Sequence, residues 1–222
     1  MKPRMFTLFL FVAVAALELL GEIYGWRNLV LSVKPLLMPS LAAHFFFSVG
    51  RKDKLAFYMV MALLFSWLGD VLLMFVELNP RYFLLGLLAF LLAHVMYMII
   101  FRSSSQGFKP RLITYATGFS LFLFGLLLLL LLWPGLGGMK LPVVVYTVVI
   151  ITMGFTALFR QAPGASYVLV GAMLFIGSDA LIAVHKFSEP VAAARFWIML
   201  TYITAQFLLA TGMITYFTTT KR

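Results

Sequence analysis

The chain has 222 residues, of which 64% are hydrophobic and 11% are charged, and its mean hydropathy is +1.06. This composition excludes a soluble domain, because soluble proteins use only about 45 to 50% apolar residues. The net charge of +10 does not predict nucleic-acid binding, since the basic residues are scattered between apolar runs instead of forming one patch.

Eight apolar stretches follow one another along the chain, separated by short segments rich in charge, proline or glycine. Each stretch is long enough to cross a hydrocarbon layer of about 30 Å as a helix. The sequence therefore predicts an all-α, polytopic membrane bundle of about eight transmembrane helices, forming a single transmembrane domain over residues 1–222. The stretches cover residues 5–22, 29–49, 55–76, 82–101, 112–133, 141–159, 165–185 and 194–217.

The distribution of lysine and arginine predicts how the helices are oriented. Eleven basic residues fall on the side that holds both termini, and five fall on the opposite side. Cytoplasmic loops carry an excess of basic residues. We therefore expect both termini to be cytoplasmic, in a multi-pass protein of the bacterial inner (cytoplasmic) membrane.

Four charged residues inside the apolar stretches are the first candidates for a functional site. A charged aspartate at the centre of a membrane helix costs about 2.5 to 3.5 kcal/mol on insertion scales, so such residues usually face the bundle interior. Asp70, Asp179 and Lys34 fall in the outer half of the membrane, and Glu18 falls near a helix end, where we expect an interfacial position. Two structural alternatives are that the aspartates only join helices by hydrogen bonds, and that Lys34 reaches surface water.

Uncharged polar residues at similar depth complete the predicted pocket. Tyr146, Tyr202 and Gln206 fall in the outer or central part of their helices. His94 lies deeper, and Ser178 adjoins the second aspartate. We expect these side chains to outline a pocket open toward the exterior half of the membrane. A lone histidine at a helix interface is commonly a packing residue, so His94 keeps that second interpretation.

No metal or cofactor site is predicted. The three histidines lie on separate apolar stretches without paired spacing, and the chain contains no cysteine. There is no glycine-rich phosphate loop and no nucleophile elbow. His44 and His185 are expected at helix interfaces. The sequence specifies no oligomeric state, and it leaves the two aspartates as the main candidates for chemistry.

Several segments, taken together, resemble the YhhN-type lysoplasmalogenase family in their order and spacing over the whole chain. The resemblance implies hydrolysis of the vinyl ether bond of lysoplasmalogens, which releases a fatty aldehyde and a glycerophosphocholine or glycerophosphoethanolamine. It also implies that Asp70 and Asp179 are the catalytic pair. The segments are Lys34-Pro35-Leu36, Phe65-Ser66-Trp67-Leu68-Gly69-Asp70-Val71-Leu72-Leu73, Gly171-Ala172-Met173-Leu174-Phe175-Ile176-Gly177-Ser178-Asp179 and Tyr202-Ile203-Thr204-Ala205-Gln206.

The chemistry of this reaction suits two buried carboxyl groups. A vinyl ether hydrolyses by rate-limiting protonation of an alkene carbon, which gives an oxocarbenium ion that water captures. Burial and a second nearby carboxylate both favour the neutral form of a carboxyl group, so the pair is expected to share a proton near neutral pH. One aspartic acid would protonate carbon while the other, ionised, stabilises the cation and orients water. The sequence leaves open which is which.

The remaining polar residues are predicted to bind the lysophospholipid substrate. Lys34 would hold the phosphate or lower the charge cost of the aspartate pair. Tyr146, Tyr202 and Gln206 would hydrogen-bond glycerol or water, with His94 and Ser178 in the same pocket.

Two other functions remain open from the sequence. Intramembrane aspartates and lysines also serve as proton relays in small proton-coupled transporters. A possible four-plus-four parallel repeat, in which Asp70 aligns with Asp179 and Tyr58 with Tyr167, favours that reading slightly. The third reading is a membrane scaffold whose aspartates only join helices.

Overall fold

The protein is an all-helical bundle, which confirms the predicted fold class. A computed structural model describes residues 3–50, 53–107 and 111–220, and these ranges contain eight long helices and no strand. All eight helices are long and apolar enough to cross a membrane, and each predicted stretch ends within two residues of its helix. The helices are α1 Pro3–Tyr24, α2 Arg27–Val49, α3 Lys54–Met74, α4 Arg81–Ser103, α5 Leu112–Leu132, α6 Lys140–Leu158, α7 Ala165–Phe187 and α8 Ala194–Thr219, with short 3₁₀ turns at Trp133–Gly135 and Gly137–Met139.

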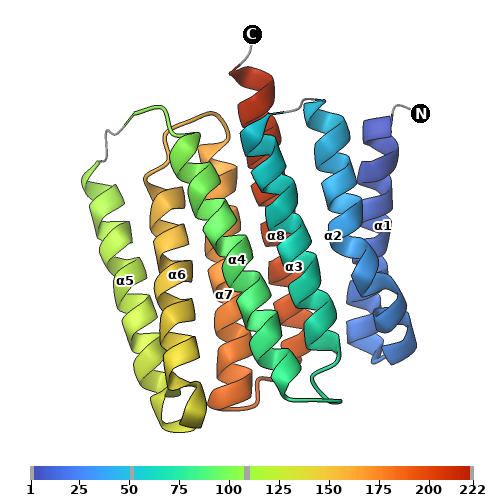
Figure 1. Ribbon diagram of the computed structural model, residues 1–222, viewed down its shortest axis with the longest axis vertical. Helices are drawn as coiled ribbons and strands as arrows, with labels where there is room; N and C mark the ends of the chain where they lie inside the picture. Colours follow the sequence, from blue (N-terminus) through green and yellow to red (C-terminus); the bar gives the residue numbers. More distant parts are fainter. Residues whose placement is uncertain (1–2, 51–52, 108–110, 221–222) are drawn as a thin grey trace.

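Successive helices run in opposite directions, so α1 begins and α8 ends at the same end of the bundle (Figure 1). We call this the terminal end. The opposite end, formed by segments 24–27, 75–80, 133–139 and 188–193, is called the distal end. The chain is thus a multi-pass membrane protein with an even number of spans in the described ranges.

Six helices form an inner ring, and two pack outside it. The ring runs α2, α3, α4, α6, α7, α8 and back to α2, while α1 packs across α2 and α8, and α5 packs across α6 and α7. Within the ring the pairings match between the two halves of the chain: α3 packs on α4 as α7 packs on α8, and α4 meets α6 as α8 meets α2. A four-plus-four parallel repeat has this arrangement. The outer helices do not match, since α1 packs on α2 and α8 whereas α5 packs on α6 and α7.

Small residues and proline bring the ring helices close together near the buried aspartates. A Cβ atom on Gly69 of α3 would lie 2.6 Å from the ring of Phe90, so only glycine allows α4 to pack this closely. In α2, Pro35 lacks an N–H group, and its own carbonyl accepts a hydrogen bond of 2.9 Å from Trp67 Nε1 of α3. This bond ties α2 to α3 one residue after Lys34.

A buried arginine joins several helices at the terminal end. Arg160 lies between α6 and α7, where its Nε donates to Ser104 Oγ at 2.8 Å and its guanidinium lies 5.4 Å from the ring centre of Tyr216. Another guanidinium nitrogen donates to the carbonyl of Pro163 at 3.2 Å. Burial lowers the pKa of Arg160 to about 10, so the side chain remains charged at neutral pH. It is a structural cation far from the distal end.

Candidate active site

A polar cavity of about 480 Å³ lies between the helices at the distal end of the bundle. Five of the residues predicted for the site line it from four different helices. They are Lys34 of α2, Asp70 of α3, Ser178 and Asp179 of α7, and Tyr202 of α8. Residues far apart in the sequence therefore converge on one cavity, at the end of the bundle opposite the chain termini.

Asp70 is held from the other half of the chain. Its side chain is buried, and the residue is 6% exposed. The hydroxyl of Tyr202 on α8 donates to Asp70 Oδ2 at 2.8 Å. The positively charged Lys34 lines the same cavity as Asp70. Asp70 thus has a hydrogen-bond donor from α8 and shares its cavity with a positive charge on α2.

Asp179 has a different set of partners. The hydroxyl of Tyr146 on α6 donates a hydrogen bond to Asp179 Oδ2. Nε2 of His94 on α4 lies 3.7 Å from the same oxygen, and the His94 side chain is fully buried. Among the described residues, neither ring nitrogen of His94 has a hydrogen-bond partner. Each aspartate is therefore hydrogen-bonded to a tyrosine from another helix.

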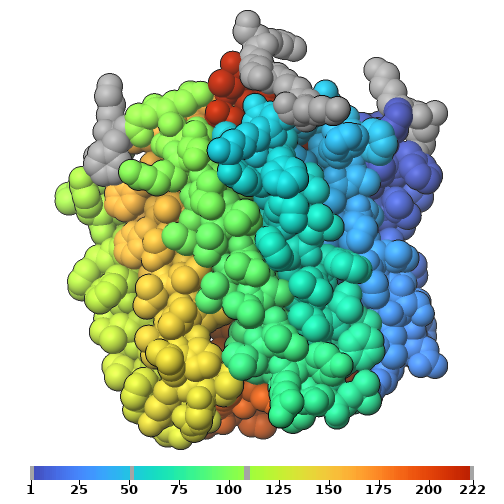
Figure 2. Space-filling model, in the orientation of Figure 1, coloured from blue at the N-terminus to red at the C-terminus, as the bar shows by residue number. Residues whose placement is uncertain are grey.

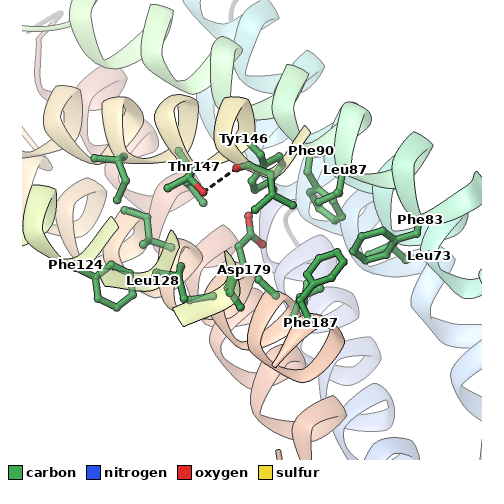
Figure 3. A pocket seen from close by; sticks show the side chains of 18 residues that line it. Leu73, Phe83, Leu87, Phe90, Phe124, Leu128, Tyr146, Thr147, Asp179 and Phe187 are labelled. Atoms are coloured by element: carbon green, nitrogen blue, oxygen red, sulfur yellow. Dashed lines mark hydrogen bonds between the residues drawn. The ribbon is translucent and has the colours of Figure 1, made fainter. Parts of the chain in front are cut away.

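A second, apolar cavity meets the polar one at Asp179. Phe83, Phe124 and Phe187 are among the side chains that line it around Asp179, and Figure 3 shows them with the carboxyl group between α6 and α7. Asp179 and Phe90 line both cavities. The surface is hollowed between α4 and α6, two of the helices that line the apolar cavity (Figure 2). Asp179 is thus placed where polar and apolar spaces join.

The predicted interfacial position of Glu18 is wrong. Its side chain is fully buried, and its Oε1 lies 3.3 Å from Lys34 Nζ. Glu22 Oε1, one turn further along α1, lies 3.6 Å from the same nitrogen. The reason is that α1 packs across α2 and α8, which covers Glu18 and brings it to a lysine that neutralises it. Lys34 therefore turns inward to two glutamates, not outward to surface water.

Two other predicted site residues take part in buried hydrogen bonds. Gln206 is fully buried, accepts a hydrogen bond from the Tyr97 hydroxyl at 2.6 Å and donates to Ser66 Oγ at 2.9 Å. Ser178 lines the polar cavity, but its hydroxyl donates to the Ile198 carbonyl of α8 at 3.0 Å. These bonds hold α8 against α3, α4 and α7. Substrate binding by the two residues stays a prediction.

The other two histidines lie apart from the aspartates. His44 Nδ1 lies 3.2 Å from the Arg4 carbonyl oxygen, a contact between α2 and α1. His185 lines the mouth of the polar cavity, where its Nδ1 accepts a hydrogen bond of 3.1 Å from the Val191 amide. In the described part of the chain, no three His, Asp or Glu side chains are grouped as metal ligands.

Sequence reasoning missed a set of charged residues at the mouth of the polar cavity. Arg27 donates to Glu77 at 2.6 Å, and a guanidinium nitrogen of Arg195 lies 3.7 Å from the other oxygen of the same glutamate. Lys186 lines the same mouth. All four residues lie at helix ends or in segments that read as loops. Each of them lies seven residues from a residue of the cavity: Arg27 from Lys34, Glu77 from Asp70, Lys186 from Asp179 and Arg195 from Tyr202. This spacing is the sequence signal that could have identified them.

Three of the known proteins that this chain resembles share one name, lysoplasmalogenase. Lysoplasmalogenase TMEM86A of Bos taurus is 35% identical over 160 residues, which are 68% of this chain and 63% of that protein. A lysoplasmalogenase of Mycobacterium tuberculosis (strain CDC 1551 / Oshkosh) is 31% identical over 186 residues, 82% of this chain and 67% of that protein. Lysoplasmalogenase TMEM86B of Homo sapiens is 33% identical over 158 residues, 67% of this chain and 59% of that protein.

The chain thus spans a little under two thirds of the length of the two mammalian relatives. No solved structure matches it. The sequence model of the YhhN family matches residues 29–213, from the first turn of α2 into the last third of α8. This range contains both aspartates, their tyrosine partners and Lys34, and by this match the chain belongs to the YhhN family.

Proposed function

We propose that this protein hydrolyses the vinyl ether bond of lysoplasmalogens within the membrane. The names of its relatives, which are lysoplasmalogenases, support this function over proton-coupled transport. The observation that carries the proposal is the position of Asp179, at the junction of a polar cavity and an apolar one. A lysolipid has the same division, since its vinyl ether bond joins an apolar chain to a polar head.

The two cavities suggest how the substrate lies. The first carbons of the alkenyl chain occupy the apolar cavity between α4, α6 and α7, whose volume of about 40 Å³ is too small for the whole chain, and the rest of the chain extends into the lipid. The glycerophosphate head extends into the polar cavity toward the distal end. The vinyl ether bond then lies between Asp179 and Asp70. In this placement the reacting carbon meets a carboxyl group without leaving apolar surroundings, which favours an uncharged proton donor.

Asp179 is assigned as the general acid, because it is the aspartate that lines both cavities. Tyr146 occupies its Oδ2, so Oδ1 carries the transferable proton. The proton moves to the alkene carbon farther from the ether oxygen, and the double bond becomes an oxocarbenium ion. Transfer to carbon leaves Asp179 ionised, and its new charge stabilises the cation beside it.

Asp70 is assigned as the ionised partner, because Lys34 attracts its carboxylate and Tyr202 donates to it. It accepts a proton from the water that attacks the oxocarbenium carbon, which gives a hemiacetal. The hemiacetal then loses the glycerol oxygen as an alcohol and yields the aldehyde. One water is consumed, and its proton on Asp70 then passes to Asp179, which restores the acid for the next cycle.

The proposal is tested with purified protein and 1-alkenyl-lysophosphocholine. We expect aldehyde and glycerophosphocholine in equal amounts by mass spectrometry. In D₂O the aldehyde should carry one deuterium on the carbon next to the carbonyl, because that carbon receives the proton. In ¹⁸O water the glycerophosphocholine should stay unlabelled, since water attacks the alkenyl carbon. Absence of aldehyde, or ¹⁸O in the glycerol fragment, would contradict the proposed reaction.

We further propose that both termini face the cytoplasm of a bacterial inner membrane, with the cavity opening at the exterior side. The excess of basic residues at the terminal end supports this orientation. Because the chain has no cysteine, a single introduced one reports its own position. A membrane-impermeant maleimide added to intact cells should label Leu78→Cys at the distal end but not Gln106→Cys at the terminal end. The reverse pattern would invert the topology.

A further inference from the structure

The polar cavity is built in two layers. The inner layer consists of Lys34, Asp70, Asp179 and Tyr202, and the outer layer consists of Arg27, Glu77, Lys186 and Arg195. Each outer residue lies seven positions from an inner one on the same segment, toward the distal end. Seven residues make about two helical turns, or about 10 Å along a helix axis. Arg27, Lys186 and Arg195 share a helix with their inner partners and so lie about 10 Å outward from them along the axis. Glu77 lies in the turn after α3 and is joined to this layer by its pairs with the two arginines.

The outer layer is positively charged and open to a ligand. It contains two arginines and a lysine against one glutamate. Glu77 pairs with both arginines, yet the Arg27 and Arg195 side chains are 60% and 73% exposed. Helix α2 begins at Arg27 and α8 begins one residue before Arg195, so the positive ends of two helix dipoles add to this charge.

The inner layer has no cation to spare for an anion. Lys34 is the basic residue of this layer, and it contacts Glu18 and Glu22 while attracting Asp70. Two carboxylates therefore contact one ammonium group, and a third lines the same cavity. A phosphate brought to Lys34 would have to displace a buried glutamate from its partner, which is strongly unfavourable. Of the two roles predicted for Lys34, phosphate binding is the one this arrangement disfavours.

We propose that the outer layer, through Arg27 and Arg195, binds the phosphate of the lysolipid substrate; this inference rests on the proposed function. Six bonds separate the alkenyl carbon at the ether oxygen from phosphorus, which spans about 7 Å when extended. The distance that remains between the phosphorus and the outer layer is covered by the side chains of Arg27 and Arg195 when they extend inward. Two guanidinium groups bind a phosphodiester through paired charge-assisted hydrogen bonds. The site thereby selects lysolipids that carry a phosphate.

The experiment compares two substrates with the same alkenyl group, 1-alkenyl-lysophosphocholine and 1-alkenylglycerol, which lacks the phosphate. In the double variant Arg27→Gln/Arg195→Gln, the KM for the phosphate-bearing substrate should rise about 10-fold or more. Its kcat should change little, because neither arginine contacts the vinyl ether. The kcat/KM for 1-alkenylglycerol should stay at the wild-type value. Glu77→Gln should lower the KM for the phosphate-bearing substrate about 3-fold, since it frees both arginines.

The matched control is Arg81→Gln/Lys140→Gln. It removes two exposed positive charges from the same end of the bundle, at residues that do not line the described cavity. Both substrates should behave as with the wild-type protein. Equal losses on both substrates in the Arg27/Arg195 variant would show that the arginines only support the fold. An unchanged KM for the phosphate-bearing substrate would place the phosphate elsewhere. Either result overturns the inference.

A binding measurement separates this inference from the proposed reaction. Acyl lysophosphocholine has no vinyl ether, so its binding does not depend on catalysis. Isothermal titration should give a Kd about 10-fold weaker for the Arg27/Arg195 variant than for the wild-type protein. If the wild-type protein releases no aldehyde but this difference is seen, the reaction is refuted and the phosphate site stands. If aldehyde is released but the two Kd values are equal, the phosphate site is refuted.

Discussion

Asp70 and Asp179 hold matching positions in the two halves of the bundle, but their neighbours differ in chemistry. Asp70 on α3 is flanked by α2 and α8, which supply Lys34 and Tyr202. Asp179 on α7 is flanked by α6 and α4, which supply Tyr146 and His94. In the four-plus-four repeat that we propose from the ring contacts, α2 corresponds to α6 and α8 corresponds to α4. The same helix positions therefore support both carboxyl groups.

The difference between the two aspartates lies in charge and in the adjoining space. Helix α2 carries the positively charged Lys34 near Asp70. The corresponding helix, α6, carries the neutral Tyr146, which is hydrogen-bonded to Asp179. Only Asp179 of the pair also lines the apolar cavity. Two identical side chains can thus occupy matching helix positions with different neighbours, and we propose that these neighbours give the two aspartates opposite protonation states. The following predictions test that division of roles.

The largest effect is expected from Asp179→Asn. An amide cannot transfer a proton to carbon, and general acid catalysis contributes about 10² to 10⁴-fold to a rate. The rate of aldehyde release per protein molecule should therefore fall about 1,000-fold. Thermal unfolding in detergent should stay close to that of the wild-type protein, since asparagine still accepts the Tyr146 hydrogen bond. A variant that keeps a tenth of the activity would remove Asp179 from the role of acid.

Asp70→Asn should cost less, about 100-fold in kcat, because attack by water follows the rate-limiting protonation. The amide loses the negative charge that stabilises the cation, but Asp179 still delivers the proton. The solvent deuterium isotope effect on aldehyde release should therefore persist in this variant. If Asp70→Asn is slower than Asp179→Asn, the two aspartates have the reverse roles.

The loss of activity should be larger for the tyrosine that is hydrogen-bonded to the ionised aspartate than for the one that is hydrogen-bonded to the neutral aspartate. A hydrogen bond to a charged group contributes more than one to a neutral group. Tyr202→Phe removes the donor to the ionised Asp70 and should lower kcat/KM about 10-fold. Tyr146→Phe removes the donor to the neutral acid and should lower it about 3-fold. Adding Tyr202→Phe to Asp70→Asn should change little more, whereas independent effects would multiply.

The sequence predicted the parts of this site that depend on composition. The helices follow from eight apolar runs of membrane length, and the aspartates stand out because charge inside such a run is costly. The pairing of side chains depends on how each helix is rotated and tilted in the ring. The bond from Tyr202 to Asp70 joins positions 132 residues apart, and no local pattern encodes it.

Two errors of sequence reasoning have specific physical causes. Glu18 lies near the end of α1, and only the packing of α1 over α2 reveals that it is buried against Lys34. Arg27 and Glu77 lie in segments whose charge predicts solvent-exposed loops. Such charges gain a role only when helices converge on a common cavity, as α2, α3, α7 and α8 do here.

The smallest effect on activity is expected from a change at the opposite end of the bundle. Arg160→Leu removes the hydrogen bonds to Ser104 and Pro163 and should lower the free energy of unfolding by about 2 kcal/mol. Its kcat/KM should match the wild-type value at a temperature where both proteins are folded. Because the pKa of Arg160 is about 10, the charge is present throughout pH 6 to 8, and the loss of stability should be constant there. A loss of activity would mean that the aspartates sense the terminal end, and the contrast between Asp70 and Asp179 would no longer be local to the two cavities.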